Sequence, residues 1–165
     1  AFSKGTIVGG TTSANGSVVA TIVGASAGNR TIINLEGEYK KLTADKKKYT
    51  HELQQTHDAL NQTKQAEIRA ESLLDLEQKK QTKTKLAIDK QRYRDQSDNI
   101  QDRLFDLKLR VSHYLSMTHL TTTKVLYSEA QVCIANQTWT NTKELGPTIV
   151  TMVDNNIELT PYTKK

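Results

Sequence analysis

Residues 35–118 read LEGEYKKLTADKKKYTHELQQTHDALNQTKQAEIRAESLLDLEQKKQTKTKLAIDKQRYRDQSDNIQDRLFDLKLRVSHYLSMT. No glycine or proline occurs between Gly37 and Gly146, and most residues of the quoted stretch are strong helix formers such as Lys, Gln, Leu, Ala and Glu. The stretch therefore predicts one or two very long α-helices, around which the rest of the chain is organised.

Two series of seam residues run through this stretch with alternating steps of four and three. That spacing keeps one narrow stripe of a helix facing a partner helix. The second series is displaced from the first by two residues, which neither a stutter nor a stammer explains, so we expect an interruption between them. The predicted seam consists of Leu35, Tyr39, Leu42, Tyr49, Leu53, Leu60 and Leu74, followed by Leu86, Tyr93, Ile100, Leu104, Leu107, Val111 and Tyr114.

A polar run without an apolar anchor, residues 78–84, separates the two series. Short connections usually join antiparallel neighbouring helices, which favours a hairpin in which Tyr49 faces Tyr114. The alternative is one bent helix of about 126 Å, at a rise of 1.5 Å per residue. Polar residues such as Lys46 and Glu67 occupy the seam, so a hairpin alone buries little apolar area and is expected to need further copies or another partner.

The composition favours an extended helical body over a compact globule. Of the 165 residues, 36% are hydrophobic, 5% aromatic and 25% charged. The predicted fold is mainly α, with long coiled-coil-like helices, a Gly-rich N-terminal segment and a small C-terminal β-ribbon. Residues 1–30 are expected to associate with a membrane or partner, residues 31–120 to form the rod, and residues 121–165 to hold a frayed helix end and the ribbon.

Residues 5–29 hold no charge and allow three interpretations. As a helix, the segment has small residues every four positions, a spacing that lets helices approach closely in a membrane. As a β-hairpin, it turns at Asn15-Gly16 between flanks rich in β-branched residues. A flexible, low-complexity tail is the third interpretation. The small residues assigned to membrane or partner packing are Gly5, Gly9, Gly16, Ala20, Gly24 and Gly28.

On these small residues, residues 5–28 resemble the glycine-zipper segments of bacterial envelope proteins and lipoproteins. The resemblance implies a location in the cell envelope, in the periplasm or at the outer membrane. The order of a Gly-rich N-terminus, two helical runs and a polar reversal also resembles class I viral fusion subunits, which makes a virion the alternative location.

The C-terminal third changes in character. Heptad spacing continues beyond residue 121, so we expect a frayed helix to about Asn136, ended by Gly146-Pro147. Residues 148–153 and 157–160 predict two short strands. Because a lone two-stranded ribbon is barely stable in water, this ribbon is expected to pack on the rod or on a partner's sheet.

Basic residues are densest over residues 79–94, where seven Lys or Arg stand against Asp89 alone, in a chain of net charge +5. Such a patch can meet phosphate or anionic lipid, so nucleic-acid binding is one alternative function. A solvated helix end is the simpler interpretation, because Tyr93 is the only aromatic residue among these cations.

No catalytic or metal-binding pattern accompanies the rod. His51 and His57 are six positions apart, as are His113 and His119, whereas ligand pairs on one helix face need spacings of three or four. Cys133 is the only cysteine, which excludes an internal disulfide framework. The spacing of Ser, His, Asp and Glu builds no triad or phosphate loop. We therefore expect no enzymatic activity, no metal and no cofactor.

The leading prediction is a non-enzymatic structural or assembly component of a cell-envelope or secretion-type complex. Its rod would span a distance, and its ends would attach to other protein subunits in a homo- or hetero-oligomer, with membrane contact through residues 5–28. A structural or fusion-like coiled-coil protein of a virus or phage is the first alternative.

Overall fold

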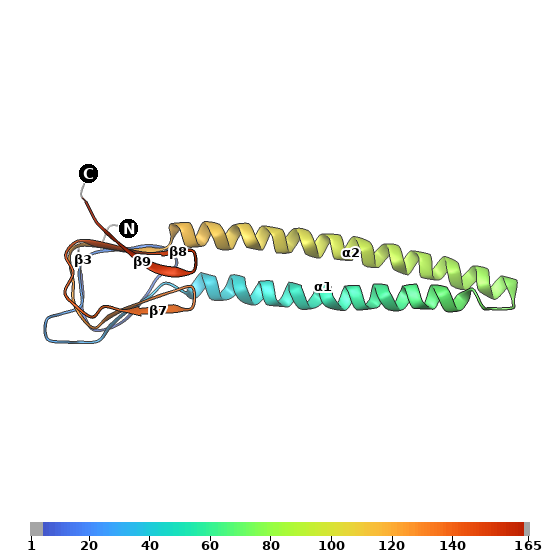
Figure 1. Cartoon of the computed structure of the whole chain (residues 1–165), viewed down its shortest axis with the longest axis horizontal. Coiled ribbons are helices and arrows are strands. Elements are labelled where there is room, and N and C mark those ends of the chain that lie inside the picture. The colour runs from blue at the N-terminus through green and yellow to red at the C-terminus, as the bar shows by residue number, and fades with distance from the viewer. Residues whose placement is uncertain (1–4, 164–165) are drawn as a thin grey trace. The chain divides into compact units, whose positions relative to one another are not determined.

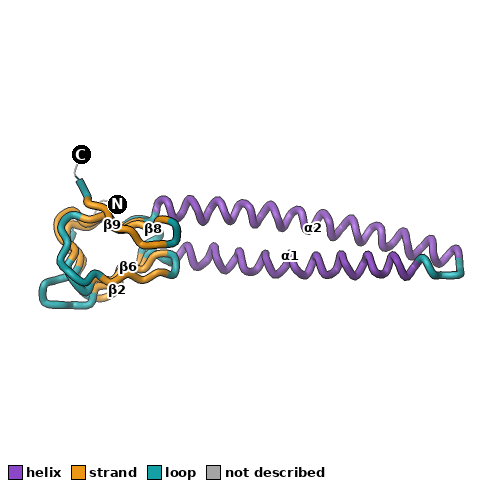
Figure 2. Tube along the Cα trace, in the orientation of Figure 1, coloured by secondary structure: helices purple, strands orange, loops and turns teal. Residues whose placement is uncertain are grey.

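The computed structural model describes residues 5–163 and falls into two units. The first unit comprises Ala1–Thr43 and Arg110–Lys165, and the second comprises Ala44–Leu109. Helix accounts for 48% and strand for 29%, and the strands form two mixed sheets (Figure 2). The prediction of a mainly α, coiled-coil-like fold is therefore wrong.

The strands belong to the first unit and build two sheets. They are β1 (Thr6–Ile7), β2 (Gly10–Ser13), β3 (Val18–Val23), β4 (Thr31–Asn34), β5 (His119–Leu126), β6 (Ala130–Ile134), β7 (Gln137–Thr140), β8 (Thr148–Val153) and β9 (Asn156–Pro161). One sheet has the order β1-β3-β5-β8-β9 and the other the order β2-β4-β6-β7.

The strand pairs β1–β2, β3–β4 and β5–β6 are three successive rungs of a coil. Each rung places one strand in each sheet and pairs in parallel with the next rung, for example Val23 with Leu126 and Ile33 with Val132. The last three strands, β7, β8 and β9, pair antiparallel and close the coil at its C-terminal end.

The hydrophobic core lies between the two sheets. Along β6 and β8 every second side chain is buried, the alternation expected of strands with one face against a core. Val132, Ile134 and Val150 occupy half of these buried positions, and their branched side chains pack well on a pleated surface. The core comprises Ala20, Val23, Ile33, Leu35, Leu120, Leu126, Ala130, Val132, Ile134, Val150 and Met152.

Two long helices, α1 (Gly37–Ala70) and α2 (Leu76–Met117), connect β4 to β5. Both begin or end in the first unit and pass into the second, and they run side by side in opposite directions (Figure 1). At 1.5 Å per residue, their 34 and 42 residues make helices of about 51 and 63 Å. In chain order, the helical hairpin is therefore the equivalent of Ala14–Ser17: the hairpin leads from β4 to β5, as Ala14–Ser17 lead from β2 to β3.

The chain reverses at residues 71–75 and not at the predicted residues 78–84, which lie inside α2. Asp75 caps the second helix: its Oδ1 accepts hydrogen bonds from the backbone N–H groups of Glu77 (2.9 Å) and Gln78 (3.2 Å). The earlier reversal changes the register, so Tyr49 lies against the Arg103 guanidinium, 5.6 Å from the ring centroid, and does not face Tyr114 as predicted.

The interpretations of residues 5–28 as helix, hairpin or tail are all wrong. Strands β2 and β3 do flank Asn15-Gly16, yet they lie in different sheets and pair with β4 and β5 instead of with each other. Ala20 and Val23 are buried in the core. No helix among the described residues is both long enough and apolar enough to cross a membrane.

The C-terminal third also departs from the prediction. Residues expected to form a frayed helix form β5 and β6, whose β-branched side chains favour strands. The predicted ribbon is not isolated, because β8 pairs with β5 and thereby extends the larger sheet. Two-residue turns with positive φ at both positions, Ala135-Asn136 and Asp154-Asn155, connect the antiparallel strands.

Candidate functional site

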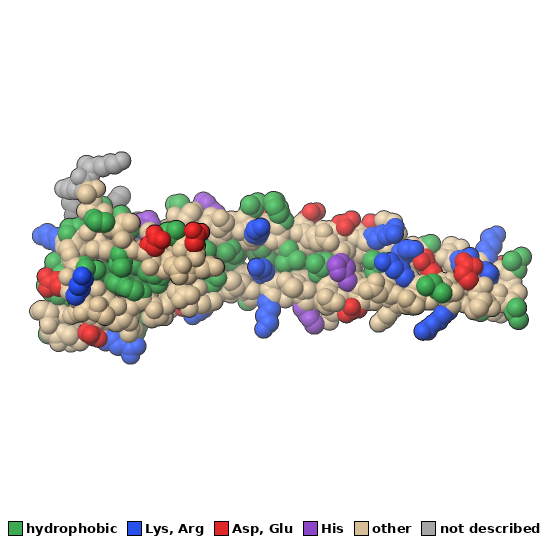
Figure 3. Space-filling model, in the orientation of Figure 1, with side chains coloured by type: hydrophobic (Ala, Val, Ile, Leu, Met, Phe, Trp, Pro, Cys, Tyr) green, Lys and Arg blue, Asp and Glu red, His purple; other side chains and the backbone are tan. Residues whose placement is uncertain are grey.

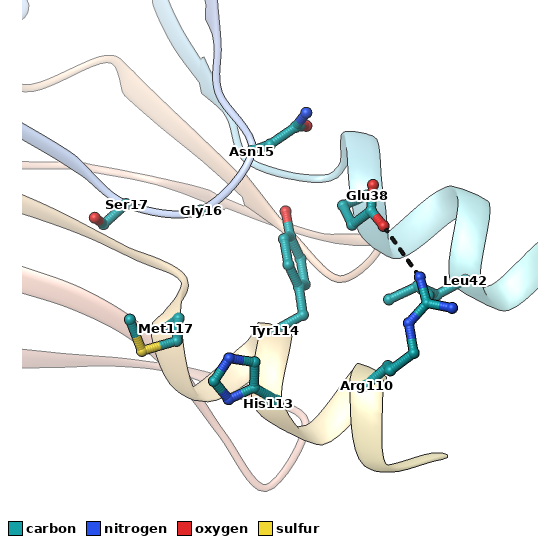
Figure 4. A pocket seen from close by; sticks show the side chains of 9 residues that line it. All are labelled: Asn15, Gly16, Ser17, Glu38, Leu42, Arg110, His113, Tyr114 and Met117. Atoms are coloured by element: carbon teal, nitrogen blue, oxygen red, sulfur yellow. Dashed lines mark ion pairs between the residues drawn. The ribbon is translucent and has the colours of Figure 1, made fainter. Parts of the chain in front are cut away.

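An open cavity of about 460 Å³ lies in the first unit, between the return from β2 to β3 and the ends of the two helices (Figure 4). The return contributes a polar turn, α1 contributes its first two turns, and α2 contributes its last two. The lining residues are Asn15, Gly16, Ser17, Glu38, Leu42, Arg110, His113, Tyr114 and Met117.

Tyr114 fixes the last turns of α2 beside the residue that leads into α1. Its hydroxyl donates a 2.6 Å hydrogen bond to the backbone carbonyl of Leu35, whose side chain is fully buried in the core. The buried hydroxyl of Thr118 donates to the carbonyl of Tyr114 at 2.7 Å and satisfies one of the free carbonyls at the end of the helix.

An ion pair crosses the mouth of the cavity. The guanidinium of Arg110 lies 3.8 Å from Oε1 of Glu38 (Figure 4), and Lys41 lies 3.9 Å from the other carboxylate oxygen. Water reaches both side chains, of which 54% (Arg110) and 34% (Glu38) is exposed, so the pair contributes at most about 1 kcal/mol to stability.

Glu36, directly before α1, is hydrogen-bonded to the turn between β6 and β7. One carboxylate oxygen accepts a 2.8 Å hydrogen bond from the backbone N–H of Asn136, and the other lies 2.7 Å from Lys40. The hydrogen bond with Glu36 raises the pKa of Lys40. This nearly buried carboxylate therefore holds α1 to the β6–β7 turn.

Three polar side chains of the cavity, Tyr114, Glu38 and Arg110, hold helix ends together through the contacts described above. No group of three or more His, Cys, Asp or Glu among residues 5–163 is arranged to hold a metal ion. Cys133 lies in β6, where its sulfur accepts a 3.5 Å hydrogen bond from Thr138. His57 lies in the second unit, 3.3 Å from Ser97. The contacts of Tyr114 and of the Glu38–Arg110 pair in the cavity tie the ends of the two helices together.

The six small residues predicted to pack a membrane or partner do not share one helical face. Gly9, Gly16, Gly24 and Gly28 have positive φ and lie in turns of the coil. Ala20 is buried in β3, and Gly5 precedes β1. The glycine-zipper interpretation is wrong for this reason.

The predicted seam residues are spread over several environments. Leu42, Ile100 and Leu107 are buried within the helices, whereas Leu35 is buried in the core before α1 begins, and Leu74 is fully exposed in the connection. Of the seam, only Leu42 and Tyr114 line the cavity. The half-buried members are Tyr39, Tyr49, Leu53, Leu60, Leu86, Tyr93, Leu104, Val111 and Tyr114.

Sequence reasoning missed Glu36, Glu38 and Arg110. These residues join positions that are many tens of residues apart, and the wrong reversal point placed α1 against the wrong part of α2. The Asp75 cap, directly before the helix-forming run that starts at Leu76, was the signal that could have corrected the register.

A family model described as FapA: Flagellar Assembly Protein A beta solenoid domain matches residues 1–157. No curated protein and no solved structure gives a significant match. The three parallel rungs agree with the word solenoid in that description, and the match replaces the resemblance to glycine-zipper envelope proteins, which is wrong. The chain therefore belongs to the family of the Flagellar Assembly Protein A beta solenoid domain.

Proposed function

We propose that the chain is a non-enzymatic component of flagellar assembly in which a β-solenoid carries a helical hairpin, and the hairpin binds other protein subunits. The family description supports a role as an assembly component and gives no support to the alternative of a viral protein. In finer terms, we place the protein in a cell-envelope assembly complex and regard the hairpin as its contact element.

The observation that carries this proposal is the insertion of the hairpin between two stacked rungs. The chain passes from the first rung to the second through only Ala14–Ser17. A connection as long as residues 35–118 is therefore not needed to stack the third rung on the second. The second unit, Ala44–Leu109, contains helix and the connection between helices but contributes no strand to the sheets. A long surface insertion on a repeat scaffold is a common place for function.

The hairpin also exposes large apolar side chains to water, where a partner protein could cover them. Seven of the eleven exposed large hydrophobic residues in the described chain lie in the second unit. Apolar side chains, in green, reach the surface along the helices in Figure 3. Exposed apolar groups surrounded by polar ones are typical of protein–protein contact surfaces. The seven are Ile68, Leu73, Leu74, Leu76, Ile88, Phe105 and Leu109.

Nucleic-acid binding through residues 79–94 receives less support. Lys79 and Lys83 both pair with Glu71, and Lys90 lies 2.6 Å from Glu67. Two carboxylates thus engage three of the seven cations of this run, and a cation tied to a neighbouring carboxylate is a poorer partner for phosphate.

The test is complementation of cells that lack the gene. One strain receives the wild-type gene, and a second receives a variant in which residues 44–109 are replaced by a short Gly-containing turn. We expect the shortened protein to accumulate normally, yet cells carrying it should bear few or no flagella by electron microscopy. Wild-type numbers of flagella in that strain would contradict the proposal.

A cavity variant separates assembly from catalysis. Changing Arg110→Ala and His113→Ala removes the guanidinium and the imidazole from the cavity but leaves the second unit unaltered. If the protein is a non-enzymatic component, flagella should form in near-normal numbers with this variant. Loss of flagella from a stable Arg110→Ala/His113→Ala protein would instead favour a chemical role for the cavity.

A further inference from the structure

The connection between α1 and α2 exposes three leucines within four positions. Leu74 is fully exposed, 81% of Leu76 and 38% of Leu73 are exposed, and none of the three belongs to the hydrophobic core. Asp75 lies between the last two leucines and Glu77 follows them, and neither acid forms an ion pair with another described residue. We call residues 73–77 the tip. It presents a convex apolar surface with two negative charges.

Hydrogen bonds within the hairpin hold the tip in one conformation. Asp75 caps the start of α2, and the Lys79 ammonium donates a 2.7 Å hydrogen bond to the backbone carbonyl of Glu71. The backbone N–H of Leu73 donates to the carbonyl of Ala70 at 3.3 Å. A preorganised segment loses less conformational entropy when it binds than a flexible one does. The exposed leucines are therefore presented at a low entropic cost of binding.

A second open cavity lies in the first unit, between β7, β9 and residues 141–148. Its volume is about 530 Å³. Strands β7 and β9 are the last strands of their sheets, and Leu159 of β9 keeps 42% of its surface exposed. Lys143 also lines this cavity and forms no ion pair with another described residue. We call the cavity the cap groove; its apolar lining consists of Trp139, Leu145, Pro147, Leu159 and Pro161.

The tip and the cap groove complement each other in shape, polarity and charge. The groove is concave and mostly apolar and carries a positive charge at Lys143, whereas the tip is convex and apolar and carries negative charges at Asp75 and Glu77. Such a match supplies affinity, orientation and fast association. Unbroken helices of 34 and 42 residues separate the tip from the strands of its own chain, so the groove that receives it belongs to a second copy.

Other candidates for the occupant of the groove and for the target of the tip fit less well. Ile88 is exposed on α2, but the ammonium of neighbouring Lys85 would repel Lys143. Phe105 and Leu109 lie along the side of the same unbroken helix, which presents a straight surface instead of a protrusion. An anionic lipid surface would repel the carboxylates that stand beside the leucines of the tip. A second copy therefore suits both surfaces best.

We propose that the tip of one copy binds in the cap groove of a second copy. The leucines of the tip pack against Trp139 and Leu159, and its carboxylates face Lys143. This inference rests on the proposed function, since it names the subunit that the hairpin contacts. The contact uses two different surfaces of each copy, so every complex keeps one unoccupied tip and one unoccupied groove, and further copies add head to tail.

Sedimentation velocity of the full chain over a wide range of protein concentration tests the contact. The wild-type mass should rise beyond that of a dimer as the concentration increases. A tip variant, Leu73→Ser with Leu74→Ser, removes the apolar protrusion, and a groove variant, Leu159→Glu, places a negative charge where the tip carboxylates would lie. Each should weaken association by about tenfold or more.

Matched controls change exposed apolar residues outside both surfaces. Phe105→Ser with Leu109→Ser is the control for the tip variant, and Val153→Glu, at a residue with 40% exposure, is the control for the groove variant. Both controls should associate as the wild type does, and circular dichroism must show wild-type helix and strand content in every variant. Equal losses in controls and variants would overturn the proposal.

A mixture of the two variants is the sharpest arm of the experiment. The tip variant keeps an intact groove and the groove variant keeps an intact tip, so the equimolar mixture should form a heterodimer that does not grow further. If the mixture stays monomeric, the proposal is wrong. Wild-type association of the groove variant alone would also overturn it, because tips would then bind each other.

A charge exchange provides a second test that leaves the apolar residues in place. Lys143→Glu and Glu77→Lys should each weaken association, and a mixture of these two variants should associate more tightly than either variant alone. No gain in the mixture would contradict the assigned orientation of the tip in the groove. A wild-type chain that stays monomeric at every concentration overturns this inference alone, because loss of flagella on hairpin removal would still support the proposed function.

Discussion

The hydroxyl of Tyr114, near the end of α2, donates a 2.6 Å hydrogen bond to the carbonyl of Leu35, 79 positions earlier in the chain and just before α1. One bond thus joins the two points at which the chain leaves the solenoid and returns to it. The insertion is closed at its base by this contact, by Glu38–Arg110, and by the contact of Glu36 with Asn136.

Replacing Tyr114→Phe should lower the free energy of unfolding by about 1 kcal/mol. The ring stays in place, while the buried Leu35 carbonyl loses its donor. Urea unfolding followed by circular dichroism measures the change. Tyr39→Phe, at another half-buried tyrosine of the same region, is the control and should have little effect; equal losses from both variants would show that the bond does not matter.

Gly24→Ala should destabilise the solenoid by about 1–3 kcal/mol. Gly24 has φ of +85°, and an added Cβ would lie 3.0 Å from Cβ of Tyr127 on the next rung. Gly37→Ala is the matched control, because its Cβ would meet only the mobile end of the Asn15 side chain and alanine favours the helix. A Gly24→Ala protein as stable as Gly37→Ala would contradict the rung geometry.

Asn141→Ala should cost about 1–3 kcal/mol, since two carbonyls lose a donor. The buried side-chain amide of Asn141 donates to the carbonyls of Leu126 and Tyr127 at 3.0 and 2.9 Å, at the corner between β5 and β6. Thermal unfolding compares this variant with Asn156→Ala, whose exposed amide makes one weaker contact at 3.3 Å. Similar melting temperatures for the two variants would be incompatible with a structural role for the corner.

The connection between the helices should loosen in acid. Hydrogen bonds from Lys83 and then Lys79 hold the pKa of Glu71 below its ordinary value of 4.5. A carboxyl whose folded-state pKa is lowered stabilises the fold above its unfolded pKa and loses that contribution as the pH falls through the folded value. The protection factor for amide hydrogen exchange around residues 71–83, which corrects for the intrinsic pH dependence of exchange, should therefore fall below about pH 4.5.

Glu71→Gln should remove this acid step, because the amide does not titrate. Glu77→Gln, which changes a carboxyl outside the ion-pair cluster, should keep it. Protection factors in Glu71→Gln that still fall in acid as in wild type would assign the pH dependence to another group.

The sequence predicted the existence of long helices better than their ends. The run without glycine or proline predicted helices, and the heptad spacing correctly placed Leu42, Ile100 and Leu107 on buried helical faces. The reversal was misplaced because Leu74 fell on the heptad spacing of the seam, although it lies in the connection. In a seam with many polar residues, one exposed leucine at the right spacing was given more weight than the turn-favouring residues Ser72 and Asp75.

The solenoid could not be predicted for a different reason. Asn15-Gly16 is a true turn, but successive strands of a coil lie in different sheets, so the strand after the turn pairs with β5, about a hundred residues later. Likewise, Val125 and Val132 continue a heptad spacing by chance, whereas burial in a sheet decides their structure. Contacts such as Glu36 with Asn136 depend on this topology and leave no local pattern.

The helical hairpin is an insertion on a β-solenoid, and we expect the solenoid to fold without it. The most direct measurement is far-ultraviolet circular dichroism, with thermal unfolding, of the protein whose residues 44–109 are replaced by a short turn. Helix makes up 48% of the structure, so we expect most of the helix signal to disappear while the strand signal remains and melts in one cooperative transition. Loss of the strand signal together with the helix would contradict it, since the hairpin would then be part of what holds the rungs together.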